Sequence, residues 1–216
     1  MTFKNRRFLR TCVTSLALVA ALGAGLSACA PLIFGGAAVG ALMASDRRTS
    51  GAQIEDEGIE LRSASRIRDS LVDRTHVNIT SYNRQVLLTG EVPTAQDKQL
   101  VEQIVSRVDN VRAIVNELAV LGNTSLTQRS SDALVTGKVK AAMVDAKDLF
   151  ANSFKVVTER GTTYLMGRVS QREGDRATEI ARGTSGVLKV VRIFETVGED
   201  ELKRLLPTPA PGDAKK

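Results

Sequence analysis

The feature that most constrains this 216-residue chain is an internal repeat. Residues 77–90 align with residues 154–167 at a constant offset of 77, and the alignment continues to Ile114-Val115 and Val190-Val191 after one residue is dropped. Each copy has about 65 residues, a size that buries only about 60% of its chain surface and is marginally stable alone. We therefore expect two small modules that lean on each other. A repeated small unit also favours binding over catalysis.

The N-terminus predicts a lipoprotein signal peptide. Four basic residues precede an apolar run at residues 12–26, which is shorter than the roughly 20 residues of a membrane-spanning helix. Residues 26–29, Leu-Ser-Ala-Cys, resemble a bacterial lipobox. This resemblance implies removal of residues 1–28 and lipid attachment at Cys29. In the alternative, ordinary cleavage near Ala28 leaves Cys29 as a free thiol.

The charge balance does not support a nucleic-acid-binding surface. The chain has 30 basic and 24 acidic residues, but residues 1–28 contain four of the basic residues and none of the acidic ones. The mature chain therefore has 26 basic and 24 acidic residues, a net charge of +2. This is too small for a typical nucleic-acid binder. Because Cys12 leaves with the signal and Cys29 is expected to be lipidated, no disulfide is expected.

Composition divides the mature chain into five segments. Residues 29–56 are rich in Ala and Gly at their start and predict a lipidated tether, because their apolar stretch is too short to cross a bilayer. The first module is expected at 57–121, a polar linker at 122–129 and the second module at 130–197. The proline-rich residues 198–216 predict a disordered tail.

Hydrophobic periodicity predicts the order α-β-β-α-β in each copy. In the first copy we expect a helix around 59–71, strands around 77–79 and 86–88 joined by a turn at 81–84, a helix at 94–108 and a strand at 113–120. In the second copy we expect a helix at 132–144, strands at 154–158 and 163–169, a helix at 172–182 and a strand at 189–196. The predicted fold class is α+β, with each module a three-stranded mixed sheet packed on two helices.

Gly90 and Gly167 occupy equivalent positions, where a strand leads towards the following helix. Glycine at such a position predicts a backbone that has no room for a Cβ atom. No glycine-rich phosphate-binding pattern surrounds either residue.

The repeated residues resemble a known family, the BON domain. The matching stretches are Val77–Val92 with Asn110-Val111, and Val156–Val169 with Ser185-Gly-Val187. With the lipobox and residues 46–56, they resemble the dual BON-domain outer-membrane lipoproteins over roughly residues 26–196. The resemblance implies a lipid anchor at the periplasmic face of the outer membrane, and enrichment at division sites. It also implies binding of anionic phospholipids such as cardiolipin and phosphatidylglycerol, a role in envelope integrity, and no enzymatic activity.

Charge distinguishes the two copies. Residues 57–121 carry 8 basic and 9 acidic side chains, net −1, whereas residues 130–195 carry 11 and 8, net +3. A positive surface attracts anionic headgroups, so the second copy is the better candidate for lipid binding.

The first helix of the second copy provides a candidate lipid-binding face. At 100° per residue, the side chains expected in the core are Val135, Val139, Ala142 and Met143. The side chains of a different arc are Leu134, Gly137, Lys138, Ala141 and Asp145, with Lys140 beside them. Leu134 can enter the headgroup layer while Lys138 reaches phosphate. The resemblance also implies that this helix binds lipid.

The surroundings of this face leave an alternative open. The following loop, with Lys147, Leu149 and Phe150, is expected to extend the face. In the alternative, Leu134 covers the edge of the core, against the first module, and Lys138 is simply solvated.

No residue pattern indicates a catalytic or metal centre. The only histidine, His76, precedes a strand and is expected to be a solvated loop residue. We therefore expect no zinc site, no Cys/His dyad and no cofactor. Glu173 and Asp175 are expected to be solvated in the first turn of a helix, where the helix dipole favours carboxylates. The protein is predicted not to be an enzyme.

Two other functions stay open. One is a protein adaptor that contacts the outer-membrane assembly machinery through sheet edges or helix faces. The other is a self-associating envelope scaffold, because the same element order occurs in ring-building modules of secretion systems.

Overall fold

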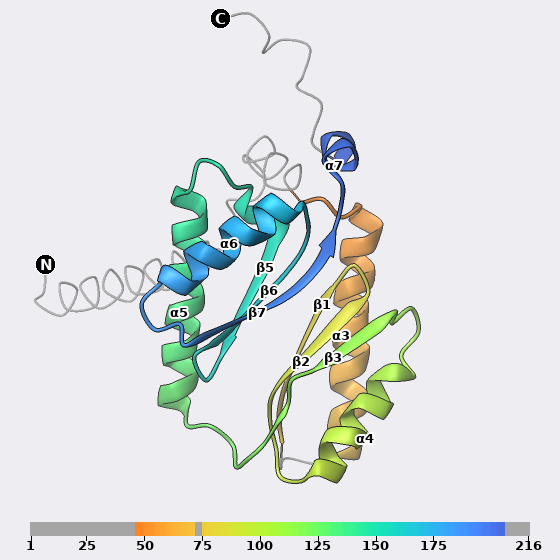
Figure 1. Cartoon of the computed structure of the whole chain (residues 1–216). Helices are drawn as coiled ribbons and strands as arrows, with labels where there is room; N and C mark the ends of the chain where they lie inside the picture. The colour runs from red at the N-terminus through yellow and green to blue at the C-terminus, as the bar shows by residue number, and fades with distance from the viewer. Residues whose placement is uncertain (1–45, 72–74, 206–216) are drawn as a thin grey trace, which may run out of the picture. The chain divides into compact units, whose positions relative to one another are not determined.

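The first copy folds into the predicted order of elements (Figure 1). In this computed structural model, which describes residues 46–71 and 75–205, they are α3 (Ser50–Ser70), β1 (His76–Tyr82), β2 (Gln85–Val92), α4 (Ala95–Ser106), β3 (Ala113–Asn116) and β4 (Ala119–Val120). β1 pairs with β2 antiparallel, and β3 and β4 both pair with β2 in parallel. The predicted signal peptide, Cys29 and most of the predicted tether and tail lie outside the described residues.

The second copy repeats this arrangement. Its elements are α5 (Leu126–Asp145), the short helix η2 (Ala151–Ser153), β5 (Phe154–Glu159), β6 (Thr162–Val169), α6 (Gln171–Gly183) and β7 (Lys189–Thr196), followed by α7 (Glu199–Leu205). β6 is the central strand, antiparallel to β5 and parallel to β7. The α+β class, with mixed sheets packed on helices, is confirmed.

The predicted strand 113–120 is interrupted, whereas its counterpart β7 is continuous. Between β3 and β4, the Asn116 side chain accepts a hydrogen bond from the backbone N–H of Leu118 at 3.2 Å. The Leu118 side chain is buried in the core of the first copy. A local side-chain bond of this kind competes with strand pairing.

Helices also occupy residues for which no helix was predicted. α3 begins at Ser50, in the predicted tether, and α5 begins at Leu126, in the predicted linker. In each case a hydroxyl caps the helix: Thr49 accepts from the N–H of Ala52, and Ser125 accepts from Gln128. Such caps stabilise a first turn that has no buried apolar residue. α7 occupies part of the predicted tail. Within the described part of the chain, no helix has the length and apolarity needed to cross a membrane.

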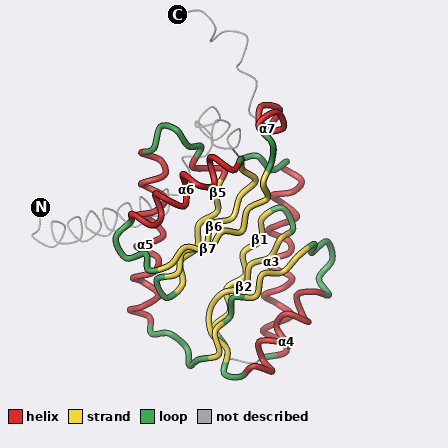
Figure 2. Tube along the Cα trace, in the orientation of Figure 1, coloured by secondary structure: helices red, strands yellow, loops and turns green. Residues whose placement is uncertain are grey.

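Each sheet packs one face on its own helices. In the first copy the core includes Ile59, Ile67, Val86, Leu88, Val101 and Val105. In the second it includes Val135, Val139, Met143, Val156, Leu165 and Ala177. The other faces of the sheets contact each other through Tyr82, Leu87, Tyr164, Met166 and Ile193. Figure 2 shows the strands of both sheets between the helices of the two modules. The expectation that the modules lean on each other is therefore confirmed.

The equivalent glycines have no room for a side chain, as predicted. A Cβ on Gly90 would lie 2.0 Å from the carbonyl oxygen of His76, and one on Gly167 would lie 2.6 Å from that of Ser153. Gly90 also has φ +110°, a conformation that L side chains rarely adopt. These glycines let the first strand of each sheet approach the second closely.

Candidate lipid-binding surface and module contacts

α5 exposes the face that the sequence selects for lipid. Leu134 is 68% exposed, so it does not cover the edge of the core, and Val135, Val139 and Met143 on the opposite face are buried. Gly137, Lys138, Lys140 and Ala141 are also exposed. Apart from its chain neighbours and the backbone of its own helix, no atom of the described residues lies within 4 Å of a Cβ built on Gly137. The alternative in which Leu134 packs against the first module is wrong.

Two further apolar residues lengthen this face. Leu126 and Val144 are exposed, and at 100° per residue they share the arc of Gly137 and Ala141. From Leu126 to Val144 the face measures roughly 27 Å at 1.5 Å per residue. Lys138 and Lys140 border it on opposite sides. We call Leu126, Leu134, Gly137, Lys138, Lys140, Ala141 and Val144 the α5 face. The sequence prediction missed Leu126 because the predicted helix began at residue 132, and it left out Val144 although the predicted helix included that residue.

The loop after α5 does not extend this face as expected. Leu149 is buried in the core of the second module. Phe150 is about half exposed, and its ring lies 5.8 Å from the guanidinium carbon of Arg47. Lys147 is exposed. Leu149 was assigned to the surface because the helix periodicity no longer applies in the loop.

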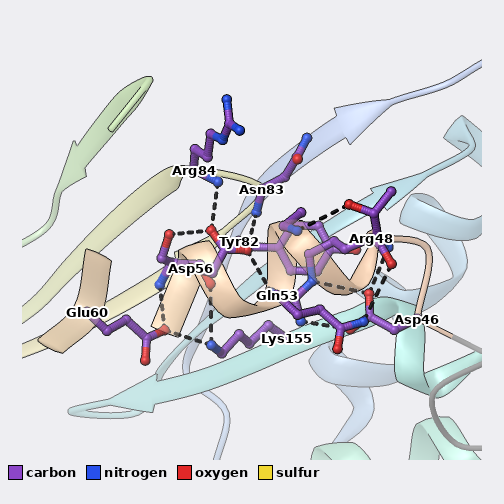
Figure 3. A network of polar contacts seen from close by, with 12 residues as sticks. Asp46, Arg48, Gln53, Asp56, Glu60, Tyr82, Asn83, Arg84 and Lys155 are labelled. Carbon is purple, nitrogen blue, oxygen red and sulfur yellow. Dashed lines mark hydrogen bonds and ion pairs between the residues drawn. The ribbon is translucent and has the colours of Figure 1, made fainter. Parts of the chain in front are cut away.

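The segment before α3 is tied to both modules. Arg48 donates to Asp56 at 2.8 Å and to Asp46 at 2.7 Å, and its guanidinium carbon lies 4.4 Å from the centre of the Tyr82 ring (Figure 3). In the same network, Lys155 of the second module donates to Glu60 at 2.8 Å. These contacts fix the start of α3 against the first hairpin and β5.

Arg47 makes a buried ion pair with Glu173, which corrects the expectation of a solvated Glu173. Its two terminal nitrogens donate to Glu173 at 2.6 and 2.8 Å, and both side chains are buried. Glu173 also completes a capping box with Ser170 at the start of α6. Burial acts to raise the pKa of Glu173, but the bonds from Arg47 and Ser170 outweigh it and lower this pKa.

Each hairpin turn is held by an aspartate from the first helix of its module. Asp56 accepts hydrogen bonds from the backbone N–H groups of Asn83 and Arg84, both at 2.8 Å. Asp132 likewise accepts hydrogen bonds from the backbone N–H groups of Arg160 and Gly161, at 2.8 and 3.0 Å. The sequence prediction missed this role, although both aspartates occupy equivalent positions in the repeat.

At one end of the contact between the sheets, Tyr82 reaches the second module. Its hydroxyl accepts from the backbone N–H of Arg168 at 3.3 Å and donates to the carbonyl of Ser153 at 3.4 Å. Next to it, Asn83 donates to Glu195. Burial is the main cause that raises the pKa of Tyr82 to about 12. We call Tyr82, Asn83, Ser153, Arg168 and Glu195 the Tyr82 junction.

At the other end lies the only histidine. His76 belongs to β1, its side chain is 15% exposed, and its Nδ1 lies 2.9 Å from Oε2 of Glu91, its partner across the strands. It is therefore not a solvated loop residue, because the strand begins earlier than predicted and the sheets cover it. Arg160 of the second module donates to Glu91 at 3.2 Å. Asn78 donates to Glu159 at 2.9 Å. We call His76, Asn78, Glu91, Glu159 and Arg160 the His76 junction.

The two carboxylates of the His76 junction differ in acidity. Burial acts to raise the pKa of Glu91, but hydrogen bonds from His76 and Thr124 outweigh it and lower this pKa. Burial raises the pKa of Glu159, and the bond from Asn78 only partly offsets it.

Comparison with known proteins defines the class of this fold. The family model of the BON domain matches the chain twice, at residues 55–122 and 131–197. The chain belongs to the BON-domain family, as a protein with two such domains.

Individual relatives narrow this class. The chain is 36% identical over 172 residues to the outer membrane lipoprotein DolP of Haemophilus influenzae, covering 79% of this chain and 89% of the relative. It is 31% identical to a 21 kDa hemolysin of Actinobacillus pleuropneumoniae, covering 70% of this chain and 79% of the relative. The chain is therefore a DolP-like protein with two BON domains.

Among solved structures, the C-terminal domain of CdsD, a structural protein of the type III secretion system of Chlamydia trachomatis, is 13% identical. The match covers 62% of this chain and 96% of that domain, with a TM-score of 0.28. A likeness at this level supports no conclusion about assembly.

Proposed function

We propose that this protein is a lipid-anchored outer-membrane protein that binds anionic phospholipid through the α5 face and so maintains envelope integrity. The name of its relative, outer membrane lipoprotein, supports the location. The lipobox supports lipid attachment at Cys29, with the modules in the periplasm. We extend the proposal to enrichment at division sites, which the BON resemblance suggests. The role is binding, not catalysis.

The observation that carries the lipid proposal is the composition of the α5 face. Its exposed apolar and small residues can lie among headgroups, while Lys138 and Lys140 on its borders reach phosphate. Attachment through Cys29 would hold the protein at a membrane surface, so that even weak headgroup binding becomes effective.

Flotation with lipid vesicles tests this proposal. The fragment of residues 44–216 contains both BON domains and lacks the predicted lipid anchor. We expect this fragment to bind vesicles that contain phosphatidylglycerol or cardiolipin, to bind phosphatidylcholine vesicles poorly, and to lose binding as salt screens the charges. The double variant Leu134→Asp/Lys138→Glu lowers the charge of the face by three and should bind roughly 150-fold more weakly, since each charge near an anionic surface contributes about 1 kcal/mol.

A matched control changes the same number of charges on α3. Leu61 and Arg68 are exposed there, so Leu61→Asp/Arg68→Glu should leave binding within about two-fold. Equal losses in both double variants would refute the α5 face. Binding to a co-purifying protein regardless of lipid would favour the adaptor instead.

Mass spectrometry of the natively produced protein tests the anchor. The expected N-terminal residue is Cys29 carrying acyl chains, of which two or more anchor a protein stably. An unmodified N-terminus near residue 29 would contradict this part of the proposal.

A further inference from the structure

The His76 junction contains three side chains with the chemistry of metal ligands. His76 and Glu91 come from adjacent strands of the first module, and Glu159 comes from the end of β5 in the second. One ligand atom from each lies within 4.8 Å of the other two. Glu91 is fully buried and Glu159 is 5% exposed. Carboxylates in such positions normally pair with a cation or hydrogen-bond donors.

We propose that His76, Glu91 and Glu159 bind one divalent transition-metal ion, with Zn²⁺ the best fit, and that this ion joins the two modules. A tetrahedral site with bonds of 2.0–2.2 Å has ligand atoms about 3.3 Å apart. The Nδ1 of His76 and Oε2 of Glu91 are already 2.9 Å apart. A small movement of Glu159 towards this pair completes three protein ligands, and a water molecule supplies the fourth.

The surrounding residues orient these ligands. Arg160 donates to one oxygen of Glu91, and Thr124 donates to the other through its backbone N–H and its hydroxyl, at 3.2 and 3.1 Å. Asn78 holds Oε2 of Glu159. Hydrogen bonds to ligating carboxylates are typical of metal sites, where they fix the ligand geometry.

A second observation comes from Thr89. It pairs across the strands with Asn78 and lies two residues from Glu91, on the same face of β2. Its hydroxyl is buried and has no hydrogen-bond partner among the described residues. A water molecule bound to the metal explains why a buried hydroxyl in this position has no protein partner. The Thr89 hydroxyl can accept a hydrogen bond from this water or donate one to it.

The equivalent residues of the Tyr82 junction lack this chemistry. At the offset of 77, His76, Glu91 and Glu159 correspond to Ser153, Arg168 and Tyr82. There the Tyr82 hydroxyl makes direct hydrogen bonds to the backbone of Arg168 and Ser153 in the other module, and the Arg168 side chain pairs with Glu195 of its own module. Metal-ligand side chains are therefore specific to the His76 junction and are not needed for the packing of the two modules at the equivalent positions.

Zinc titration of the full chain in non-ionic detergent tests the site. The protein is purified without a histidine tag and treated with a chelator, so that His76 gives the only imidazole signals in its NMR spectrum. We expect one Zn²⁺ per chain, a shift of these signals complete at one equivalent, and a rise in Tm of roughly 5 °C or more at a hundred-fold excess over Kd. Mg²⁺ should cause neither change, because it prefers six oxygen ligands.

Variants distinguish this site from adventitious binding. His76→Gln and Glu159→Gln should each weaken Zn²⁺ binding at least ten-fold, the loss typical even of residues that only orient a ligand. Glu195→Gln, which removes the carboxylate at the Tyr82 junction, should bind zinc like the unmodified chain. Circular dichroism without zinc checks that each variant folds.

Two results would overturn the proposal. One is an imidazole signal of the unmodified chain that does not move at one equivalent of Zn²⁺. The other is equal zinc affinity in the folded His76→Gln variant. If a variant does not fold, the imidazole signal of the unmodified chain decides alone.

Discussion

The first helices of the two modules, α3 and α5, share a buried face and differ in their exposed one. Asp56, Ile59, Ser63 and Ile67 are buried in α3, and Asp132, Val135, Val139 and Met143 are buried at the equivalent positions of α5. Along its whole length α3 has five acidic and three basic residues, whereas α5 has two acidic and three basic residues. Packing limits what can change on the buried side, while the solvent side of each copy is free to acquire its own binding properties.

The two junctions at the ends of the contact between the modules also share a backbone arrangement and differ in their side chains. Both junctions join a hairpin of one module to the strand ends of the other, yet their side chains differ in chemistry. The backbone arrangement is repeated, and the function at each end depends on individual residues.

The largest effect is expected at the equivalent glycines. Gly90→Ala should destabilise the protein by about 4 kcal/mol or more, because it adds both a backbone clash and an unfavourable φ. Gly167→Ala meets a milder clash without positive φ and should cost about 2 kcal/mol. Urea unfolding of both variants measures the difference. Equal costs would mean that the first module relaxes around the new methyl group.

Removing the aspartate that holds each hairpin should destabilise both modules, the first more. Asp56 accepts from two backbone N–H groups, the Ser81 hydroxyl and Arg48, so Asp56→Ala should cost about 3 kcal/mol. Asp132 accepts from two backbone groups and one amide, so Asp132→Ala should cost about 2 kcal/mol. Thermal unfolding measures both. A larger loss for Asp132→Ala would contradict this order.

Acid should destabilise the protein through two buried carboxylates. Burial acts to raise the pKa of Asp56, but hydrogen bonds from Ser81, Arg84 and Arg48 outweigh it and lower this pKa, as Arg47 does for Glu173. Because both pKa values are lower in the folded state, this stabilisation is complete above the ordinary values of 3.8 and 4.5 and is lost as the pH falls through the folded values.

The free energy of unfolding at several pH values checks this dependence. Asp56→Asn should flatten the acid limb of the profile, because its amide does not titrate. An unchanged slope in Asp56→Asn would show that other carboxylates dominate the acid response.

The smallest effect is a gain of lipid binding on α3. Glu57 and Gly58 correspond to Ala133 and Leu134 of α5, and Arg62 already occupies the position of Lys138. In the background of Leu134→Asp/Lys138→Glu, the change Glu57→Ala/Gly58→Leu should raise vesicle binding about five-fold. Flotation on phosphatidylglycerol vesicles measures it. No gain would mean that the position of α5, rather than its composition, decides lipid binding.

Much of the fold could be predicted from the sequence, because periodicity and glycine positions depend on local geometry. The equivalent elements, Gly90 and the buried side of α5 are examples. The exposure of Leu134 could not be settled in this way, because helix periodicity does not show what packs on the far side. Leu149 was misplaced for a related reason, since a loop has no period to follow.

The sequence by itself determined the repeat, the element order and the candidate residues of the α5 face, because these depend on spacing along the chain. Only the tertiary structure decided that His76 lies beside Glu91 and Glu159, and that Arg47 pairs with Glu173. Those contacts join residues far apart in the sequence. They form because each sheet has a second apolar face, which becomes buried only when the two modules pack together.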